Sequence, residues 1–152
     1  MIRRIRPEDR EIYLHMAWDF YHSDAVLHPV PYENLTASFD EMMRSDAYMT
    51  GWIFEWEGNT AGYALLCKTW SQEAGGRAVW IDEIYMLPEY RGRGIGRWFF
   101  SQLKEIEPAA RYRLEIEPEN IRAKTLYEAM GFTELGYQQL VMDIARAIEG
   151  TE

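Results

Sequence analysis

The spacing of hydrophobic residues predicts two helices in the first third of the chain. Ile12, Met16 and Phe20 recur at helical spacing, and Pro7 stands where a proline suits a first helical turn. We therefore expect a helix that runs from Pro7 to about residue 21, behind a short strand at 2–6. A loop at 22–31 separates it from a second helix, expected at about 33–45.

The rest of the chain alternates between strand and helix patterns. Residues 48–57 and 60–70 show a period of two around Gly58-Asn59, which is a strong hairpin signal. The elements expected after this hairpin are, in order, a turn at Ala74-Gly75-Gly76, a strand at 78–87, a helix that stops before Pro108, a strand at 111–117, a helix at about 120–130, and a terminal pair of strands within 132–144.

This order of elements predicts a mixed α/β fold with a central, mostly antiparallel sheet flanked by helices. One parallel pair is expected where the strand at 78–87 crosses over, through a helix, to the strand at 111–117. The 152 residues are most simply one domain, 1–152, which is large enough to bury a single core.

A glycine-rich turn links the strand at 78–87 to the next helix and reads Arg91-Gly92-Arg93-Gly94-Ile95-Gly96. Glycines let the backbone turn sharply and approach a ligand closely. The unpaired N–H groups and the dipole of the following helix favour negative charge in the same space. A phosphate-binding turn is therefore indicated. The turn lacks the Lys-Ser/Thr of a P-loop and the G-x-G-x-x-G spacing of a dinucleotide fingerprint, and a flexible surface turn is the alternative.

Two blocks of sequence give the chain a family resemblance. The first is R-x-x-G-x-G from Arg91 to Gly96, behind the strand that ends at Pro88. The second has the spacing N-x-x-A-x-x-x-Y-x-x-x-G-F, and its positions are filled by Asn120, Ala123, Tyr127, Gly131 and Phe132. Together they resemble the GNAT superfamily of acetyl-CoA-dependent N-acetyltransferases. The similarity extends over nearly the whole chain and is most specific between about residues 80 and 132.

The resemblance implies that acetyl-CoA is the co-substrate, and no metal is expected. In this family the strands that correspond to 78–87 and 111–117 splay apart and admit the pantetheine arm. The glycine turn would bind the diphosphate, and the backbone of Ile84 to Met86 would hold the pantetheine and the thioester carbonyl. The residues implied to bind the cofactor are Ile84, Tyr85, Met86, Arg91, Gly92, Arg93, Gly94, Ile95, Gly96, Arg97, Asn120 and Lys124.

The resemblance also implies the catalytic residues. Tyr127 is the expected proton donor to the departing thiolate, and its alternative role is that of a core aromatic. Asn120, two helical turns before it, can donate to a pantetheine carbonyl or cap the helix. The general base is expected among Asp82 and Glu83, which point to opposite faces of a regular strand. We favour Glu83, and an ion-pair role is the alternative.

The acceptor is expected to be a primary amine of a small molecule or peptide, attacked directly in a ternary complex. Its binding residues are expected in the variable segment that contains Tyr21, His22 and Asp24, and at Trp52. A loop cap or a core position is the alternative for each of the last three. A non-catalytic acyl-CoA-binding module on the same fold is the alternative for the whole chain.

Composition narrows the partners and the compartment. The formal net charge of −9 disfavours nucleic acid and anionic membranes and suits a cationic acceptor. Cys67, the one cysteine, lies in an apolar run, so we interpret it as a packing residue in a reducing cytoplasm. No spanning helix, signal peptide or metal-ligand cluster is recognisable. A homodimer is common in the family, although no sequence feature specifies one.

Overall fold

The computed structural model describes residues 1–24 and 26–144. Within this part of the chain a single sheet has five strands in the order β1-β2-β3-β4-β5. All neighbours are antiparallel except β4 and β5, which are parallel, as the sequence predicts. The strands are β1 (Ile2–Arg4), β2 (Met49–Trp56), β3 (Asn59–Ser71), β4 (Gly76–Met86) and β5 (Arg111–Leu114).

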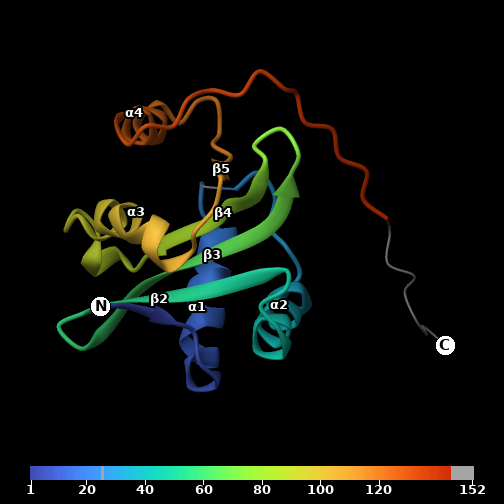
Figure 1. Cartoon of the computed structure of the whole chain (residues 1–152). Coiled ribbons are helices and arrows are strands. Elements are labelled where there is room, and N and C mark those ends of the chain that lie inside the picture. The colour runs from blue at the N-terminus through green and yellow to red at the C-terminus, as the bar shows by residue number, and fades with distance from the viewer. Residues whose placement is uncertain (25, 145–152) are drawn as a thin grey trace.

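Helices cover both faces of the sheet (Figure 1). On one face, α1 and α2 close a core around Tyr13, Phe39 and Tyr63, and on the other α3 closes a core around Phe54 and Phe99. The helical segments are η1 (Pro7–Asp9), α1 (Arg10–Tyr21), α2 (Tyr32–Arg44), η2 (Pro88–Tyr90), α3 (Ile95–Ile106) and α4 (Ile121–Ala129), of which η1 and η2 are single 3-10 turns. The expected fold class, a mostly antiparallel sheet flanked by helices, is confirmed.

Local turn chemistry sets the hairpin between β2 and β3. Glu57 and Gly58 both have positive φ, at 49° and 81°, the conformation that a tight two-residue hairpin needs. β3 and β4 are then joined by a second turn, at 72–75, in which Gly75 has φ of 75°. These two hairpins place β4 in the sheet with α1 on one side and α3 on the other.

The prediction of a terminal pair of strands within 132–144 is wrong. Residues 133–144 have no strand pairing, and after α4 the chain runs along the outside of the body (Figure 1). Gly136 is the residue of this segment that favours a turn, but its φ is not positive and no turn forms there. In the described ranges, no helix has the length and apolar character needed to cross a membrane.

Candidate active site

A β-bulge in β4 determines where its two adjacent carboxylates point. Leu65 pairs with Glu83 while Leu66 pairs with Ile81, so Asp82 is an extra residue with no partner on β3. Ile81 packs in the core under α3, whereas Glu83 meets tyrosines on the α1 side. The bulge therefore reverses the regular alternation, because residues two apart would otherwise share a face.

Glu83 is a buried carboxyl group held by two phenols. Its side chain is 5% exposed, and it accepts hydrogen bonds from the hydroxyl of Tyr63 at 2.6 Å and of Tyr21 at 2.9 Å. Burial raises the pKa of Glu83 to about 7, and the charge of Asp82 adds to this, while the bonds from Tyr63 and Tyr21 act in the opposite direction. Such a group can exchange a proton near neutral pH.

Asp82 projects from the bulge to the surface. The surrounding protein atoms raise the pKa of its carboxyl group, and the nearby charge of Glu115 raises it further. The two carboxylates therefore differ in access: Asp82 reaches solvent directly, whereas Glu83 is reached through its tyrosine partners.

β4 and β5 separate at the bulge. Their register begins at Ala78 with Arg111 and ends at Ile81 with Leu114. Ile84, Tyr85 and Met86 still pair with β3, but β5 does not continue beside them. The edge of β4 that faces β5 is thus left without a strand partner over this stretch, within the part of the chain that the structure describes.

The glycine turn lies at the end of this edge. Gly92 and Gly94 have φ of 75° and 77°, the left-handed region in which a side chain is strained. Gly94 is the N-cap of α3, and no side chain caps this helix start. The first N–H groups of α3, at Ile95 and Gly96, therefore face the turn with the positive end of the helix dipole.

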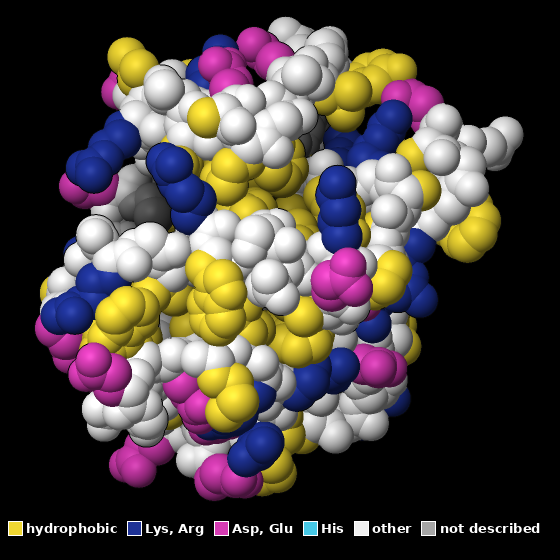
Figure 2. Space-filling model, turned by 60° about the vertical axis from the view of Figure 1, so that its left-hand side comes forward, with side chains coloured by type: hydrophobic (Ala, Val, Ile, Leu, Met, Phe, Trp, Pro, Cys, Tyr) yellow, Lys and Arg dark blue, Asp and Glu magenta, His cyan; other side chains and the backbone are white. Residues whose placement is uncertain are grey.

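Arginines surround the turn, and hydrogen bonds to backbone carbonyls hold two of them. Arg91 donates from Nε to the carbonyl of Met86 at 3.0 Å, and its guanidinium lies 5.6 Å from the ring centre of Tyr85. Arg93 donates to the carbonyl of Glu89, and Arg97 is exposed on the first turn of α3. The side of the molecule that carries α3 and α4 shows Lys and Arg side chains on both sides of an apolar band (Figure 2).

α4 packs onto α3 through aromatic rings. The ring centre of Tyr127 lies 5.5 Å from that of Phe100 and 6.0 Å from that of Phe132, and burial raises its pKa. Asn120 caps the helix by accepting from the N–H of Ala123, which leaves its amide donors available. Lys124 contacts the carboxylate of Glu134 at 3.3 Å.

The four residues expected to bind the acceptor fall in separate places. Tyr21 joins Glu83, as described above. His22 ends α1, stacks on Trp18 with ring centres 4.0 Å apart and contacts its carbonyl through Nδ1. Trp52 is 8% exposed, belongs to the core under α3 and donates to Thr50, so the structure does not bring it to Glu83.

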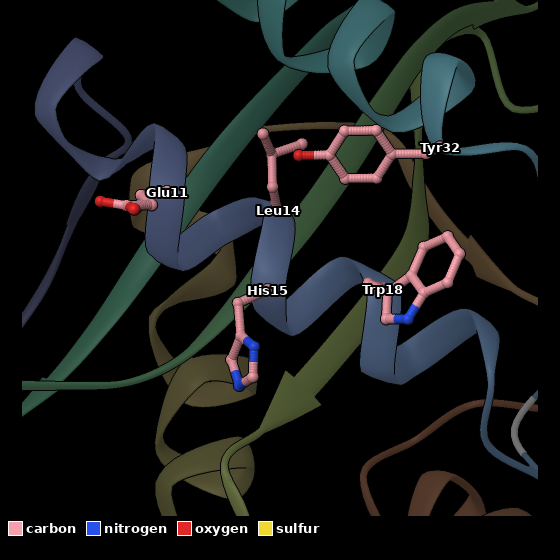
Figure 3. Close-up of a pocket in the computed structure, with 5 residues that line it drawn as sticks. All are labelled: Glu11, Leu14, His15, Trp18 and Tyr32. Atoms are coloured by element: carbon pink, nitrogen blue, oxygen red, sulfur yellow. The ribbon is translucent and has the colours of Figure 1, made fainter.

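Asp24 lines a cavity of about 420 Å³ together with Glu117, Glu119 and Asn120. This cavity lies between the segment after α1 and the connection from β5 to α4, and it carries three carboxylates. A separate hollow of about 410 Å³ lies along α1, where Leu14, Trp18 and Tyr32 gather (Figure 3). It contains none of the residues that meet at Glu83.

Sequence reasoning missed Tyr63 and Asp19. Tyr63 lies opposite Tyr85 in the β3–β4 register, so a correct hairpin alignment could have placed it beside β4. Asp19 accepts from the Tyr85 hydroxyl at 3.3 Å and contacts His15 at 3.5 Å. No local signal distinguishes it from any other exposed helical carboxylate.

Comparison with known proteins shows which family has a sequence like this one. Residues 10–132 match the model of the Acetyltransferase (GNAT) family. A thialysine N-epsilon-acetyltransferase from Bos taurus is 35% identical over 77 residues, which are 49% of this chain and 45% of that protein. A spermine/spermidine N(1)-acetyltransferase from Bacillus subtilis (strain 168) is 29% identical over 83 residues, 51% of this chain and 55% of that protein.

A solved structure extends the likeness to the whole fold. The structure described as a possible acetyltransferase from Clostridium difficile 630 has a TM-score of 0.82 and 22% identity, and the match covers 96% of this chain and 98% of that one. The chain spans about half the length of the curated relatives that it matches.

Proposed function

The chain belongs to the acetyltransferase (GNAT) family, and on this premise we propose that it transfers an acetyl group from acetyl-CoA to an amine of a small molecule. One observation carries the proposal. The unpaired edge of β4, from Ile84 to Met86, leads directly to the uncapped start of α3 at Gly94. A ligand with an extended amide-bearing arm and a diphosphate matches both features at once.

The residues at this place fit such a cofactor. The backbone of Ile84 to Met86 along the open edge would pair with the amides of the arm, and the carbonyl of Met86 already accepts from Arg91. The N–H groups at the start of α3 would bind the diphosphate, and Arg91, Arg93 and Arg97 would add positive charge. The bound cofactor supplies an activated acetyl group and a thiolate leaving group. Lys124 and Asn120, which the family resemblance implies, are proposed cofactor contacts at and near the start of α4.

Direct transfer to the amine is favoured over a covalent acetyl-enzyme. Burial raises the pKa of the Cys67 thiol to about 12, so this group stays protonated near neutral pH and is a poor nucleophile. The amine must then lose its own proton, because an ammonium has no lone pair with which to attack.

We assign the role of proton acceptor to Glu83, with Tyr21 as the relay. Tyr21 is half-buried, whereas Tyr63 is only 1% exposed, so Tyr21 is the phenol on the outer side of the carboxyl group. When Tyr21 passes its hydroxyl proton to Glu83, its oxygen accepts one from the ammonium, and the charges balance. Asp82, which reaches solvent at the bulge, is the second candidate for this role.

Tyr127 is the proposed proton donor to the leaving thiolate. Burial among Phe100 and Phe132 raises its pKa, so the hydroxyl holds its proton until a strong base forms beside it. Glu83 must accept a proton and Tyr127 must donate one at the same pH. The different environments of the two groups set the pKa of each for its task.

We propose that the acceptor is a small amine that carries a second cationic group. The cavity lined by Asp24, Glu117 and Glu119 offers three carboxylates to such a group, and the net charge of −9 favours the approach of a cation. The matched relatives are named for the acetylation of thialysine and of spermine and spermidine. On the evidence of its single cysteine, we place the reaction in the cytoplasm.

Calorimetry with acetyl-CoA tests the cofactor site. We expect Gly94→Asp to weaken binding at least tenfold, because the side chain strains the turn and places a negative charge at the start of α3. Gly75→Asp is the matched control: it has the same positive φ and an equally open surrounding, but lies in the β3–β4 turn. Equal affinity of the two variants would refute the assignment of the turn.

Turnover is tested by thiol release with paired amines, 1,4-diaminobutane and butylamine. We expect a kcat/KM at least tenfold higher for the diamine, and loss of this preference in Asp24→Asn. Equal rates for the two amines would remove the acidic cavity from acceptor binding. Cofactor binding without thiol release from a broad amine panel would instead support the non-catalytic acyl-CoA-binding module.

A further inference from the structure

The side chain of Arg93, in the middle of the glycine turn, is held by two aromatic rings. The central carbon of its guanidinium lies 5.6 Å from the ring centre of Trp56 and 5.7 Å from that of Tyr90. Its Nε donates to the carbonyl of Glu89 at 3.2 Å. A cation over the face of an aromatic ring is attracted by the electrons of the ring, so both rings restrain this side chain.

The two rings are anchored in the body of the molecule. Trp56 is the last residue of β2 and Tyr90 is the last residue of η2, and both pack against the core under α3. The N–H of Tyr90 also donates to the carbonyl of Leu87 at 2.9 Å. Arg93 itself is exposed. Its contacts therefore tie an exposed turn to two rings that the core holds in place.

The indole group of Trp56 is not explained by packing alone. Its ring nitrogen is buried and has no hydrogen-bond partner among the described residues. A buried donor without an acceptor destabilises a fold, and an apolar side chain at this position would avoid that loss. Tryptophan is, however, the aromatic side chain that attracts a cation most strongly. Contact with Arg93 therefore accounts for a tryptophan here better than core packing does.

The glycine turn has little else to hold its shape. Gly92 and Gly94, on either side of Arg93, have positive φ, and a side chain added to either would meet nothing within 4 Å. Glycine loses more conformational freedom than any other residue when it is ordered. In the described part of the chain, the N–H groups of residues 92–94 donate to no other backbone group. The restraint on this stretch therefore comes from the side chain of Arg93.

Trp56 lies on the far side of the turn from the proposed cofactor site. In the sheet order β2 is separated from β4 by β3, whereas the open edge of β4 faces β5. The ring of Trp56 therefore does not line the opening between β4 and β5. An effect of this ring on the cofactor must pass through Arg93 and the turn.

We propose that Trp56 and Tyr90 are positioning residues for the cofactor turn, and that both act through Arg93. The rings hold the guanidinium, and the guanidinium holds Gly92 to Gly94 in the conformation that presents the start of α3 to a diphosphate. This role rests on the proposed acetyl-CoA site. A turn that is ordered in advance loses less conformational freedom on binding, so the contact strengthens affinity without touching the ligand.

Calorimetry with acetyl-CoA on the full chain tests this role. Trp56→Leu should weaken binding about fivefold, and Trp56→Phe, which keeps a ring, should stay within about twofold of the native protein. In thiol-release assays KM for acetyl-CoA should rise by the same factor, while kcat at saturation stays within about twofold. Trp70→Leu, which removes an exposed tryptophan on β3, is the matched control and should bind like the native protein.

A double-mutant cycle shows whether Trp56 acts through Arg93. Arg93→Met keeps the stem of the side chain and removes its charge, and in this background Trp56→Leu should cause no further loss. The loss from Trp56→Leu should also be the same at low and high salt, because no charge is removed. A fivefold loss from Trp56→Leu that persists in the Arg93→Met background overturns the proposal.

Hydrogen exchange in the free protein follows the turn without a cofactor. The N–H of Trp98 donates to the carbonyl of Gly94 at 3.0 Å, so its exchange reports on the start of α3. This exchange should be several-fold faster in Trp56→Leu and like that of the native protein in Trp56→Phe. Unchanged exchange in the middle of β3 shows that the fold of each variant is intact.

Two outcomes separate this role from the proposed function. If the native protein binds acetyl-CoA and Trp56→Leu changes neither affinity nor exchange, the rings do not position the turn, although the acetyl-CoA site stands. If the native protein does not bind acetyl-CoA, the proposed function fails and the positioning role fails with it.

Discussion

Glu83→Gln should remove a pH dependence from the stability of the fold. In the native protein burial raises the pKa of Glu83 from an ordinary 4.5 to about 7. Below about pH 4.5 the group is protonated in both the folded and the unfolded chain, so it adds no pH dependence there. Between these two values the unfolded chain has released its proton while the folded chain still holds it, so the free energy of unfolding falls as pH rises. Above about pH 7 the contribution is constant.

The size of this effect follows from the two pKa values. The interval from 4.5 to about 7 corresponds to about 3 kcal/mol at 25 °C, since each unit is worth about 1.4 kcal/mol. Glutamine keeps the shape of the side chain and cannot titrate. It still changes the hydrogen bonds with Tyr21 and Tyr63, and this difference shifts stability by an amount that does not vary with pH.

Urea unfolding followed by tryptophan fluorescence measures the effect. The difference in unfolding free energy between the native protein and Glu83→Gln should change by about 3 kcal/mol between pH 4.5 and pH 7.5, with the native protein losing stability. Glu105→Gln, which removes an exposed carboxylate on α3, is the matched control. A difference for Glu83→Gln that does not change with pH would refute the claim that burial raises this pKa.

The same group should govern the pH profile of acetyl transfer. If Glu83 accepts the proton, kcat/KM rises with pH through about 7, and Glu83→Gln loses this limb. Tyr21→Phe removes the proposed relay and should lower kcat/KM. The midpoint of the remaining activity should move upward, because Tyr21 donates to the carboxylate. Asp82→Asn should move it downward, because the charge of Asp82 favours the protonated form. If the midpoint of the pH profile moves in neither variant, Glu83 is not the base.

Three further substitutions probe the site and the sheet that carries it. Tyr127→Phe should lower kcat by roughly a hundredfold or more, because the proton of the hydroxyl group is lost. The acetyl-CoA dissociation constant from calorimetry should stay within about threefold, because the ring contacts remain. Unchanged turnover would exclude Tyr127 as the donor. Gly62→Ala should lower the urea unfolding free energy by more than about 2 kcal/mol, since its Cβ would lie 2.1 Å from the carbonyl oxygen of Tyr85. Gly58→Ala, which meets nothing within 4 Å, should cost only about 1–2 kcal/mol for its positive φ of 81°.

The parts of the fold that sequence predicted well are those with local causes. The hairpin at Gly58, the glycine turn and the end of α3 before Pro108 each depend on residues within a few positions. The splay of β4 from β5 was expected from the family resemblance, and the register confirms it. The terminal strands failed for the complementary reason: their residues have a strand pattern, but pairing depends on a partner that the pattern does not name.

The candidate site was predictable only in part. The sequence predicts Tyr21 and Glu83 as site residues, although nothing in it joins residues that lie 62 positions apart. Tyr63 was not named, because a tyrosine in an apolar strand looks like any core aromatic. Trp52 was named for the acceptor and lies in the core under α3, since aromatic residues in a hairpin do not reveal which face of the sheet they will occupy.

The bulge at Asp82 lies where the placement of Glu83 and the opening of the β4 edge coincide. In a regular strand Glu83 would share the face of Ile81 and enter the apolar core under α3, away from Tyr21 and Tyr63. One extra residue turns Glu83 toward Tyr21 and Tyr63 instead, and those hydrogen bonds make its burial tolerable. The last pair between β4 and β5 also falls at Ile81, immediately before the bulge. A single irregularity therefore accompanies both the placement of the proposed base and the opening of the edge proposed to bind the cofactor. Deletion of Asp82 should consequently impair both the placement of Glu83 and the opening of the β4 edge. A substitution at Asp82 keeps the extra backbone residue and should leave both in place.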